Sequence, residues 1–130
     1  MTQKDKELLL RDLTARLSCG VKGIITYDKS NTTFTVEGID NNVLHLSDAE
    51  DCYVEDFKPY LRPLSSMTDE EREEYRKFSY YGAAGVRPYT HGDFVAVPSF
   101  EKMDWLNAHH FDYRGLIEKG LALKAPEGMY

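Results

Sequence analysis

Closely spaced metal ligands and long apolar runs are both missing from this sequence. The only two cysteines, Cys19 and Cys52, have no second ligand at the short spacing of a zinc site, so we expect two free thiols. No run approaches the roughly 18 apolar residues of a membrane span. Charges also flank the leucines at 8–10, unlike in a secretory signal peptide. These absences predict a cytoplasmic protein with no membrane segment, no metal and no cofactor.

A surplus of basic residues is missing as well. The chain has 16 lysines and arginines against 22 aspartates and glutamates, a formal net charge of −6. Proteins that bind nucleic acid usually carry a basic stripe or patch that meets the phosphates. The acidic balance therefore makes DNA or RNA a less favoured partner than another protein.

What is present suits one globular domain. The chain has 130 residues, 42% of them hydrophobic and 12% aromatic, which is enough to bury a core within a single α+β domain. We divide it into an N-terminal helix (1–19), a β-meander (20–63), a capped helix (64–81), a flexible loop with a short strand (82–98), and a helical corner with a tail (99–130).

Leucines recur at helical spacing over residues 3–17, which predicts an amphipathic helix. Thr2 or Asp5 suits its N-cap, and Gly20 suits a left-handed exit at its end. The leucine face is expected to pack on the sheet. The opposite face is assigned to charged residues in water, namely Lys4, Lys6, Arg11, Asp12 and Arg16.

The hydrophobic period changes to two between Val21 and Leu46, which predicts three short strands joined by polar turns, with a further strand near Tyr53. A sheet this small must be closed or covered. We therefore expect a small SH3-like bent antiparallel sheet or half-barrel, with the N-terminal helix and the helical corner packed on it. The segment 58–64 contains two prolines and is expected to be a stiff connector.

Two helical signals follow. Thr68 and Glu71 have the spacing of a capping box, which predicts a helix running to about residue 81. In the helical corner, Ser99 is expected to cap a first helix and Asp112 a second one that starts at Tyr113 and ends at Gly120. Trp105 and Phe111 are expected to fill the core between this corner and the sheet.

Candidate functional residues gather in the second half of the chain. Tyrosine and arginine are common anchors of protein interfaces, so Tyr113, Arg114 and Tyr130 are candidates for an interaction surface. His91 and Asp93 extend this candidate surface because the stretch around them is predicted to be a loop, where binding residues concentrate.

His109 and His110 are a weaker alternative site. Adjacent residues on a helix point about 100° apart, so the two imidazoles are poorly placed to ligate one ion. One histidine with one carboxylate also falls short of the three protein ligands of a catalytic metal. A structural role in the fold is the favoured interpretation for both.

Two blocks, YLRPLSSMTDEE at 60–71 and DWLNAHHFDYRGLIEKGLALKAPEGMY at 104–130, cover nearly a third of the chain. They resemble short uncharacterised proteins of Bacteroides-type gut bacteria and their phages or mobile elements. The resemblance implies a small accessory protein associated with a phage or mobile element. It assigns no activity, cofactor or functional residue to this chain.

The favoured functional hypothesis is a non-enzymatic module that binds another protein. The alternative is nucleic-acid binding by the small barrel, which would present Tyr27, Phe34 and Tyr53 to bases. A third and weaker hypothesis is an enzyme that uses His109 or His91. The oligomeric state is left open.

Overall fold

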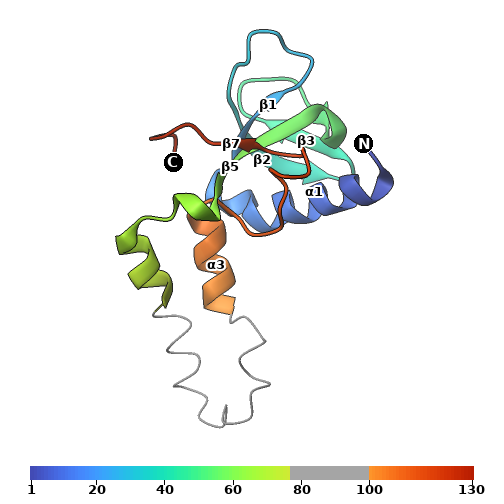
Figure 1. The fold of residues 1–130 in the computed structure, drawn as a ribbon. Helices are drawn as coiled ribbons and strands as arrows, with labels where there is room; N and C mark the ends of the chain where they lie inside the picture. Colours follow the sequence, from blue (N-terminus) through green and yellow to red (C-terminus); the bar gives the residue numbers. More distant parts are fainter. Residues whose placement is uncertain (77–99) are drawn as a thin grey trace.

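The computed structural model describes residues 1–76 and 100–130, which form an α+β fold (Figure 1). It begins with the expected helix, α1 (Gln3–Arg16). The Thr2 hydroxyl accepts a hydrogen bond from the Asp5 N–H, and the Asp5 side chain accepts one from the Thr2 N–H, so the cap is a complete capping box. A 3₁₀ turn, Leu17–Cys19, then leads to Gly20, whose φ of 71° makes the predicted left-handed exit.

Four antiparallel strands follow, as the period-two pattern predicts. They are β1 (Lys22–Ile25), β2 (Phe34–Asp40), β3 (Val43–Leu46) and β4 (Cys52–Tyr53). Each pairs with its neighbour in the chain, and a register shift between Val36 and Gly38 interrupts the β2–β3 ladder. A 3₁₀ turn, Val54–Asp56, follows β4 and leads directly into the next strand.

The prediction of a stiff connector is wrong, because this segment is strand β5 (Phe57–Pro63). It pairs antiparallel with β1 and parallel with two short C-terminal strands, β6 (Phe111–Asp112) and β7 (Leu123–Lys124). Its prolines are tolerated by position: Pro63 ends the strand, and Pro59 precedes the residues that pair with β7. The sheet is therefore mixed, not purely antiparallel as predicted, with the order β4-β3-β2-β1-β5-β6.

The prediction of a helical corner is confirmed for its first helix only. Its first helix forms as α3 (Phe100–Ala108), but the chain from 113 to 120 makes turns instead of the predicted second helix. His110 and Gly115 have φ values of 63° and 75°, which reverse the chain on both sides of β6. Pairing with β5 holds Phe111 and Asp112 extended, and Gly115 has a positive φ inside the predicted second helix, which a right-handed helix does not accommodate.

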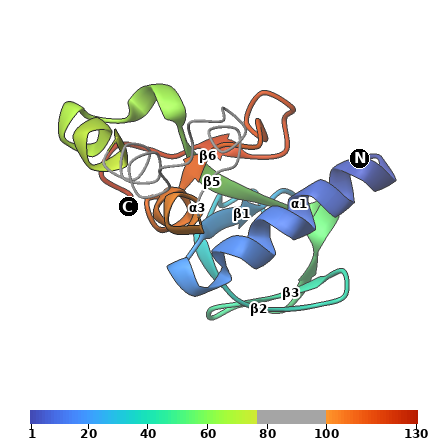
Figure 2. The ribbon, with the colours of Figure 1, turned by 90° about the horizontal axis from the view of Figure 1, so that it is seen from below.

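The main core lies between α1 and the sheet, where Leu9 and Leu13 join Val36, Phe57 and Leu61 in one buried cluster. Figure 2 shows α1 crossing the sheet near β1 and β5. Gly23 allows the close approach of these two strands, because a Cβ there would overlap the Lys58 carbonyl and the Phe57 ring.

A second, smaller cluster contains Trp105 and Phe111, which confirms both as core residues. It is completed by Tyr75, whose ring centroid lies 5.4 Å from that of Trp105. Tyr75 belongs to the helical stretch at 69–76, which lies beside α3 in Figure 1. The capping box of this stretch is also confirmed, since the Thr68 N–H donates to Glu71 and the Glu71 N–H donates to Thr68.

Other predictions fall outside the described residues. These are the end of the capped helix at 77–81, and the loop and short strand at 82–98. In the parts that the structure describes, both cysteines are free thiols, and no helix is long and apolar enough to cross a membrane.

Candidate functional site

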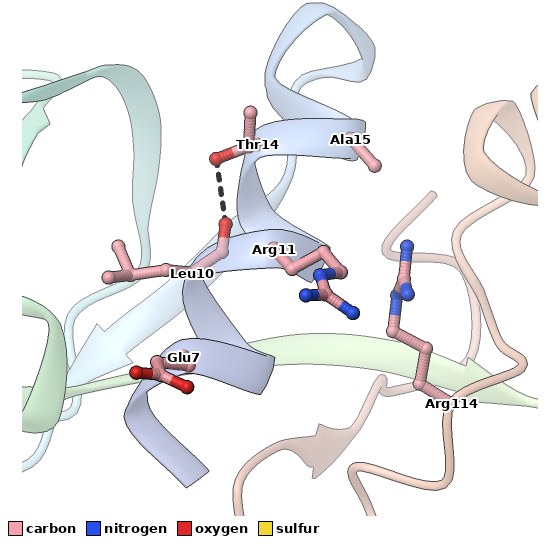
Figure 3. A pocket seen from close by; sticks show the side chains of 6 residues that line it. All are labelled: Glu7, Leu10, Arg11, Thr14, Ala15 and Arg114. Carbon is pink, nitrogen blue, oxygen red and sulfur yellow. Dashed lines mark hydrogen bonds between the residues drawn. The ribbon is translucent and has the colours of Figure 1, made fainter. Parts of the chain in front are cut away.

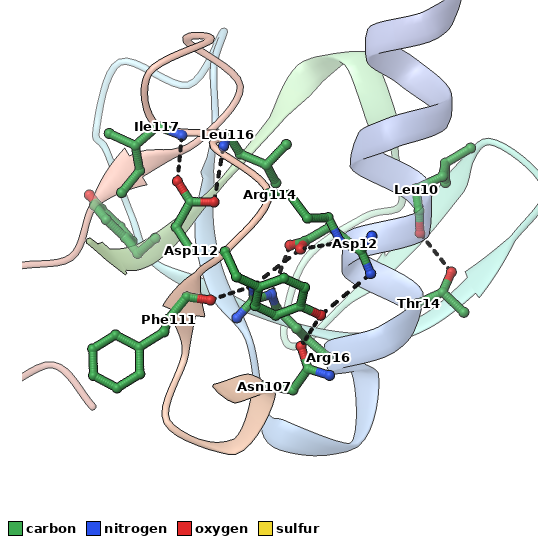
Figure 4. A network of polar contacts seen from close by, with 12 residues as sticks. Leu10, Asp12, Thr14, Arg16, Asn107, Phe111, Asp112, Arg114, Leu116 and Ile117 are labelled. Carbon is green, nitrogen blue, oxygen red and sulfur yellow. Dashed lines mark hydrogen bonds and ion pairs between the residues drawn. The ribbon is translucent and has the colours of Figure 1, made fainter. Parts of the chain in front are cut away.

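The most heavily buried charges come from α1, on the face that was predicted to be wet. Asp12 and Arg16 are both 0% exposed, so this part of the helix prediction is wrong. Arg16 donates from Nε to Asp12 Oδ2 at 2.8 Å and from Nη2 to the Phe111 carbonyl at 2.6 Å (Figure 4). The C-terminal segment covers this face of α1, and the buried ion pair joins it to the helix through the carbonyl of β6.

Arg114 reaches the same carboxylate from the other side. Its Nε donates to Asp12 Oδ1 at 3.1 Å, so one aspartate serves two guanidinium groups. The Tyr113 ring lies between these groups, with the Cζ atoms of Arg16 and Arg114 at 5.1 and 5.0 Å from its centroid. The Tyr113 hydroxyl donates to Asn107 Oδ1 at 2.7 Å. Tyr113 is therefore held by three residues and is half-buried, whereas Arg114 has an exposed edge.

That edge borders a shallow hollow of about 500 Å³ on the outer side of α1. It is lined by side chains from successive turns of α1, between Glu7 and Ala15, and by Arg114 from the C-terminal segment (Figure 3). Leu10 and Ala15 supply apolar surface, Arg11 and Arg114 supply two cations, and Glu7 supplies one carboxylate. We call this the arginine hollow.

Tyr130, the third predicted interaction residue, is used by the fold. Its hydroxyl accepts a hydrogen bond from the Lys22 N–H at 2.9 Å and donates to the Tyr60 carbonyl at 2.8 Å, which bridges β1 and β5. Burial is the main cause that raises the pKa of Tyr130 to about 12. The C-terminal residue is thus docked on the sheet, and little of it is available to a partner.

The two histidines have separate environments. His110 is buried and stacks on Tyr130 with ring centroids 3.5 Å apart, and burial followed by the positive charge of Arg16 lowers its pKa to about 4. His109 lies 3.5 Å from Glu71 through Nδ1 and packs on Trp105, with ring centroids 4.1 Å apart. The structure does not bring these imidazoles together into one site.

A second hollow, of about 250 Å³, lies where β4 meets the end of β1. Tyr27 and Tyr53 line it and are 65% and 59% exposed, which is unusual for rings of this size. The backbone fixes both sides, because the Thr26 N–H donates to the Asp56 carbonyl at 2.8 Å and Tyr53 pairs with Val43. We call this the tyrosine hollow.

The tyrosine hollow is negatively charged. Asp51 and Asp56 belong to its lining, and Asp51 Oδ1 lies 2.9 Å from His45 Nδ1. Within the described residues, no hydrogen bond or ion pair engages the Asp56 carboxylate. These carboxylates also affect the buried thiol of Cys52. Its pKa is raised to about 11, first by burial and then by the negative charges of Asp56 and Asp51. Because the thiol stays protonated, it is a poor nucleophile, and the two carboxylates can contact basic groups of a ligand.

His91 and Asp93 lie outside the described residues, so their part of the predicted surface stays a prediction. The sequence analysis assigns Arg11, Asp12 and Arg16 to the water-facing side of the helix and names none of them as a site residue. Arg11 is exposed as predicted, but Asp12 and Arg16 are buried. The signal that could have found Asp12 is its i, i+4 spacing to Arg16, which is typical of a helical ion pair but does not reveal burial. Tyr27 and Tyr53 were noticed only as possible nucleic-acid contacts.

Within residues 1–76 and 100–130, no group of three or more His, Cys, Asp or Glu side chains is placed to hold a metal ion. No family model matches the chain, and neither the curated proteins nor the solved structures compared with it include a match. The resemblance of the two sequence blocks therefore stays a prediction, and the geometry alone carries the functional argument.

Proposed function

We propose that this protein is a non-enzymatic interaction module that binds a segment of another protein in the tyrosine hollow. The observation that carries the proposal is the exposure of Tyr27 and Tyr53 on the same concave surface. Exposed tyrosines side by side cost hydrophobic free energy in the free protein, and tyrosine is among the residues that contribute most to binding when an interface covers it.

The fold supports this use of the surface. We propose that β1–β5 form an SH3-like half-barrel, as the sequence analysis expects. The support is that β5 pairs with β1 at one end of the antiparallel order, while the 3₁₀ turn Val54–Asp56 joins β4 to β5 at the other. The tyrosine hollow lies at this joint, with Tyr53 just before the turn and Asp56 at its end. A rigid frame of this kind lowers the entropic cost of binding.

The charge in the hollow favours a protein segment over the nucleic-acid alternative. Two tyrosine faces alone would suit stacked bases. Asp51 and Asp56 stand beside them, and their carboxylates would repel the phosphates that every nucleotide brings. A partner segment with basic side chains meets no such repulsion, and it gains from contact with both the carboxylates and the rings.

A selection from a displayed library of random peptides tests the proposal. The wild-type protein is expected to enrich peptides that bind it but not the double variant Y27A/Y53A, because the variant lacks both contact surfaces. Both tyrosines are exposed, so the variant is expected to fold, and its thermal unfolding verifies this.

The matched control is L64A, which also shortens an exposed apolar side chain but lies outside the hollow. It should bind the enriched peptides as the wild type does. The proposal is wrong if no enriched peptide depends on the two tyrosines. It is also wrong if the tyrosines are instead needed for binding a single-stranded oligonucleotide mixture.

A further inference from the structure

The arginine hollow has a different chemistry from the tyrosine hollow and shares no lining residue with it. In Figure 3, the guanidinium groups of Arg11 and Arg114 lie on the same side of the hollow and approach it from two different elements. Arg11 stands four residues after Glu7, the spacing of a helical ion pair, yet no ion pair joins them. The Arg11 guanidinium is left available to a ligand.

Arg114 is fixed in its position by the fold. Its Nε is hydrogen-bonded to the fully buried Asp12, and its guanidinium lies over the Tyr113 ring. These contacts occupy Nε and the side facing the ring, and Nη2 makes only a long contact of 3.4 Å with the Tyr113 hydroxyl. No contact of the described residues involves Nη1. A cation that is already ordered binds a ligand with a smaller loss of conformational entropy.

The charge behind the hollow is not balanced. The single carboxylate of Asp12 faces two guanidinium groups, those of Arg16 and Arg114, which leaves one positive charge in excess. Arg16 also has a buried Nη1 without a hydrogen-bond partner. Arg11 adds a cation and Glu7 a carboxylate at the hollow itself, so these five charged side chains together keep one positive charge in excess, in a chain whose net charge is −6.

The geometry selects among anions. A planar carboxylate binds best to the paired N–H groups of one free guanidinium edge. Asp12 takes the Nε of Arg114, so Arg114 offers its Nη groups, while Arg11 offers a complete guanidinium from α1. A carboxylate bound to one of these edges leaves the other arginine without an anion. Two guanidinium groups that converge from different elements suit a group with three oxygens directed to different sides, and two cations suit its two negative charges.

We propose that the arginine hollow binds a phosphoryl group, held between Arg11 and Arg114, with Asp12 and Tyr113 as the residues that position Arg114. The site goes beyond the proposed function, since it does not depend on the tyrosine hollow. The phosphoryl group can come from a phosphorylated side chain of a partner or from a free phosphorylated molecule, and both present the same chemistry to the two arginines.

NMR titration of the arginine side-chain N–H signals in the full chain tests this, at constant ionic strength. Three probes are used: inorganic phosphate, a short phosphoserine peptide, and the same peptide with glutamate in place of phosphoserine. Phosphate and the phosphoserine peptide are expected to shift the signals of Arg11 and Arg114, and the glutamate peptide to bind at least several-fold more weakly.

Two variants complete the design. R11Q removes an exposed side chain that the fold does not use, and it is expected to weaken phosphoserine binding by about tenfold, as loss of a charge-assisted contact does. R72Q removes an exposed arginine elsewhere and should bind as the wild type does. Tighter binding of the phosphopeptide than of phosphate identifies a protein as the source, and equal binding identifies a free molecule. Equal binding of the glutamate peptide, or equal effects of R11Q and R72Q, would overturn the proposal.

Discussion

At the scale of single residues, specific side-chain hydrogen bonds hold the C-terminal segment on the sheet. The Tyr130 hydroxyl serves Lys22 in β1 and Tyr60 in β5 at once, although these strands are far apart in the sequence. His110 turns the chain with a positive φ and covers the Tyr130 ring. Asp112 accepts from the N–H groups of Leu116 and Ile117 and so orders the turn after β6. The tail is therefore part of the fold.

The substitution Y130F removes this bridge and little else. We expect it to lower the free energy of unfolding by about 1–3 kcal/mol, because the Lys22 N–H and the Tyr60 carbonyl lose a shared partner in a partly buried position. Urea denaturation measures the change. Y27F serves as the control, since the Tyr27 hydroxyl is exposed, and it should change the free energy by less than about 0.5 kcal/mol. Equal effects of the two variants would show that the bridge does not stabilise the fold.

His110 gives the stability a predictable pH dependence. Its pKa is about 4 in the folded protein against an ordinary value of 6.5, so the unfolded chain binds more protons between these pH values. Stability is then expected to fall as the pH is lowered from 6.5 towards 4. H110N should remove this part of the slope, and asparagine also tolerates the φ of 63°.

Urea denaturation at pH 6.5 and 4.5 compares H110N with the wild type, and an NMR titration of the imidazole gives the pKa directly. Titration of His110 near pH 6.5 in the folded protein would contradict the expected burial of a neutral ring.

At the scale of elements, local sequence signals predicted what depends on near neighbours. Thr68 with Glu71 predicted its capping box, Thr2 was one of two candidates for the N-cap of α1, and alternation predicted the first strands. Strand β5 was missed because its prolines argue against a strand, and only its three distant partners make it one. The helix expected at Tyr113 failed for a related reason. β5 pairs with the chain on both sides of this segment, at 111–112 and 123–124, and Gly115 within it has a φ of 75°.

The candidate sites show the same limit. Arg114 was found from its residue type, and it does border a hollow. The burial of Asp12 and Arg16 was not predictable, because the segment that covers them lies about a hundred residues away in the sequence. The tyrosine hollow depends on the meeting of β4 with the end of β1, which the sequence pattern did not specify.

Glu71 joins two elements, because both its oxygens accept from Arg62 of β5, at 2.7 and 2.8 Å. These hydrogen bonds are the first cause that lowers the pKa of Glu71 to about 2. The carboxylate thus contributes stability that is fully present above pH 4.5 and is lost as the pH falls through about 2. E71Q is expected to destabilise the protein by about 1–2 kcal/mol at pH 7, with the difference from wild type shrinking over this pH window.

Denaturation at several pH values measures this difference. E73Q is the control from the same helical stretch, since Glu73 pairs with Arg76 in full exposure. It should show almost no effect at any pH. If E71Q and E73Q have the same pH profile, the pair of Arg62 and Glu71 does not hold the helix against the sheet.

At the scale of the whole molecule, α1 and the C-terminal segment enclose a mixed sheet and leave two hollows of opposite charge. The arginine hollow lies on the outer side of α1, and the tyrosine hollow lies at the joint of β4 with β5. Neither contains a nucleophile with a lowered pKa, since the thiol of Cys52 is held protonated. Both hollows are the surfaces that we propose to bind ligands.

The most direct measurement is a map of backbone amide NMR shifts on adding a peptide enriched by the selection described above. The account predicts that Y27A/Y53A abolishes these changes and that the largest of them fall on the residues lining the tyrosine hollow, namely Tyr27, Val43, Asp51, Cys52, Tyr53 and Asp56. Changes centred away from this lining, or changes that persist in the double variant, would contradict the claim that the protein binds its partner through these two tyrosines.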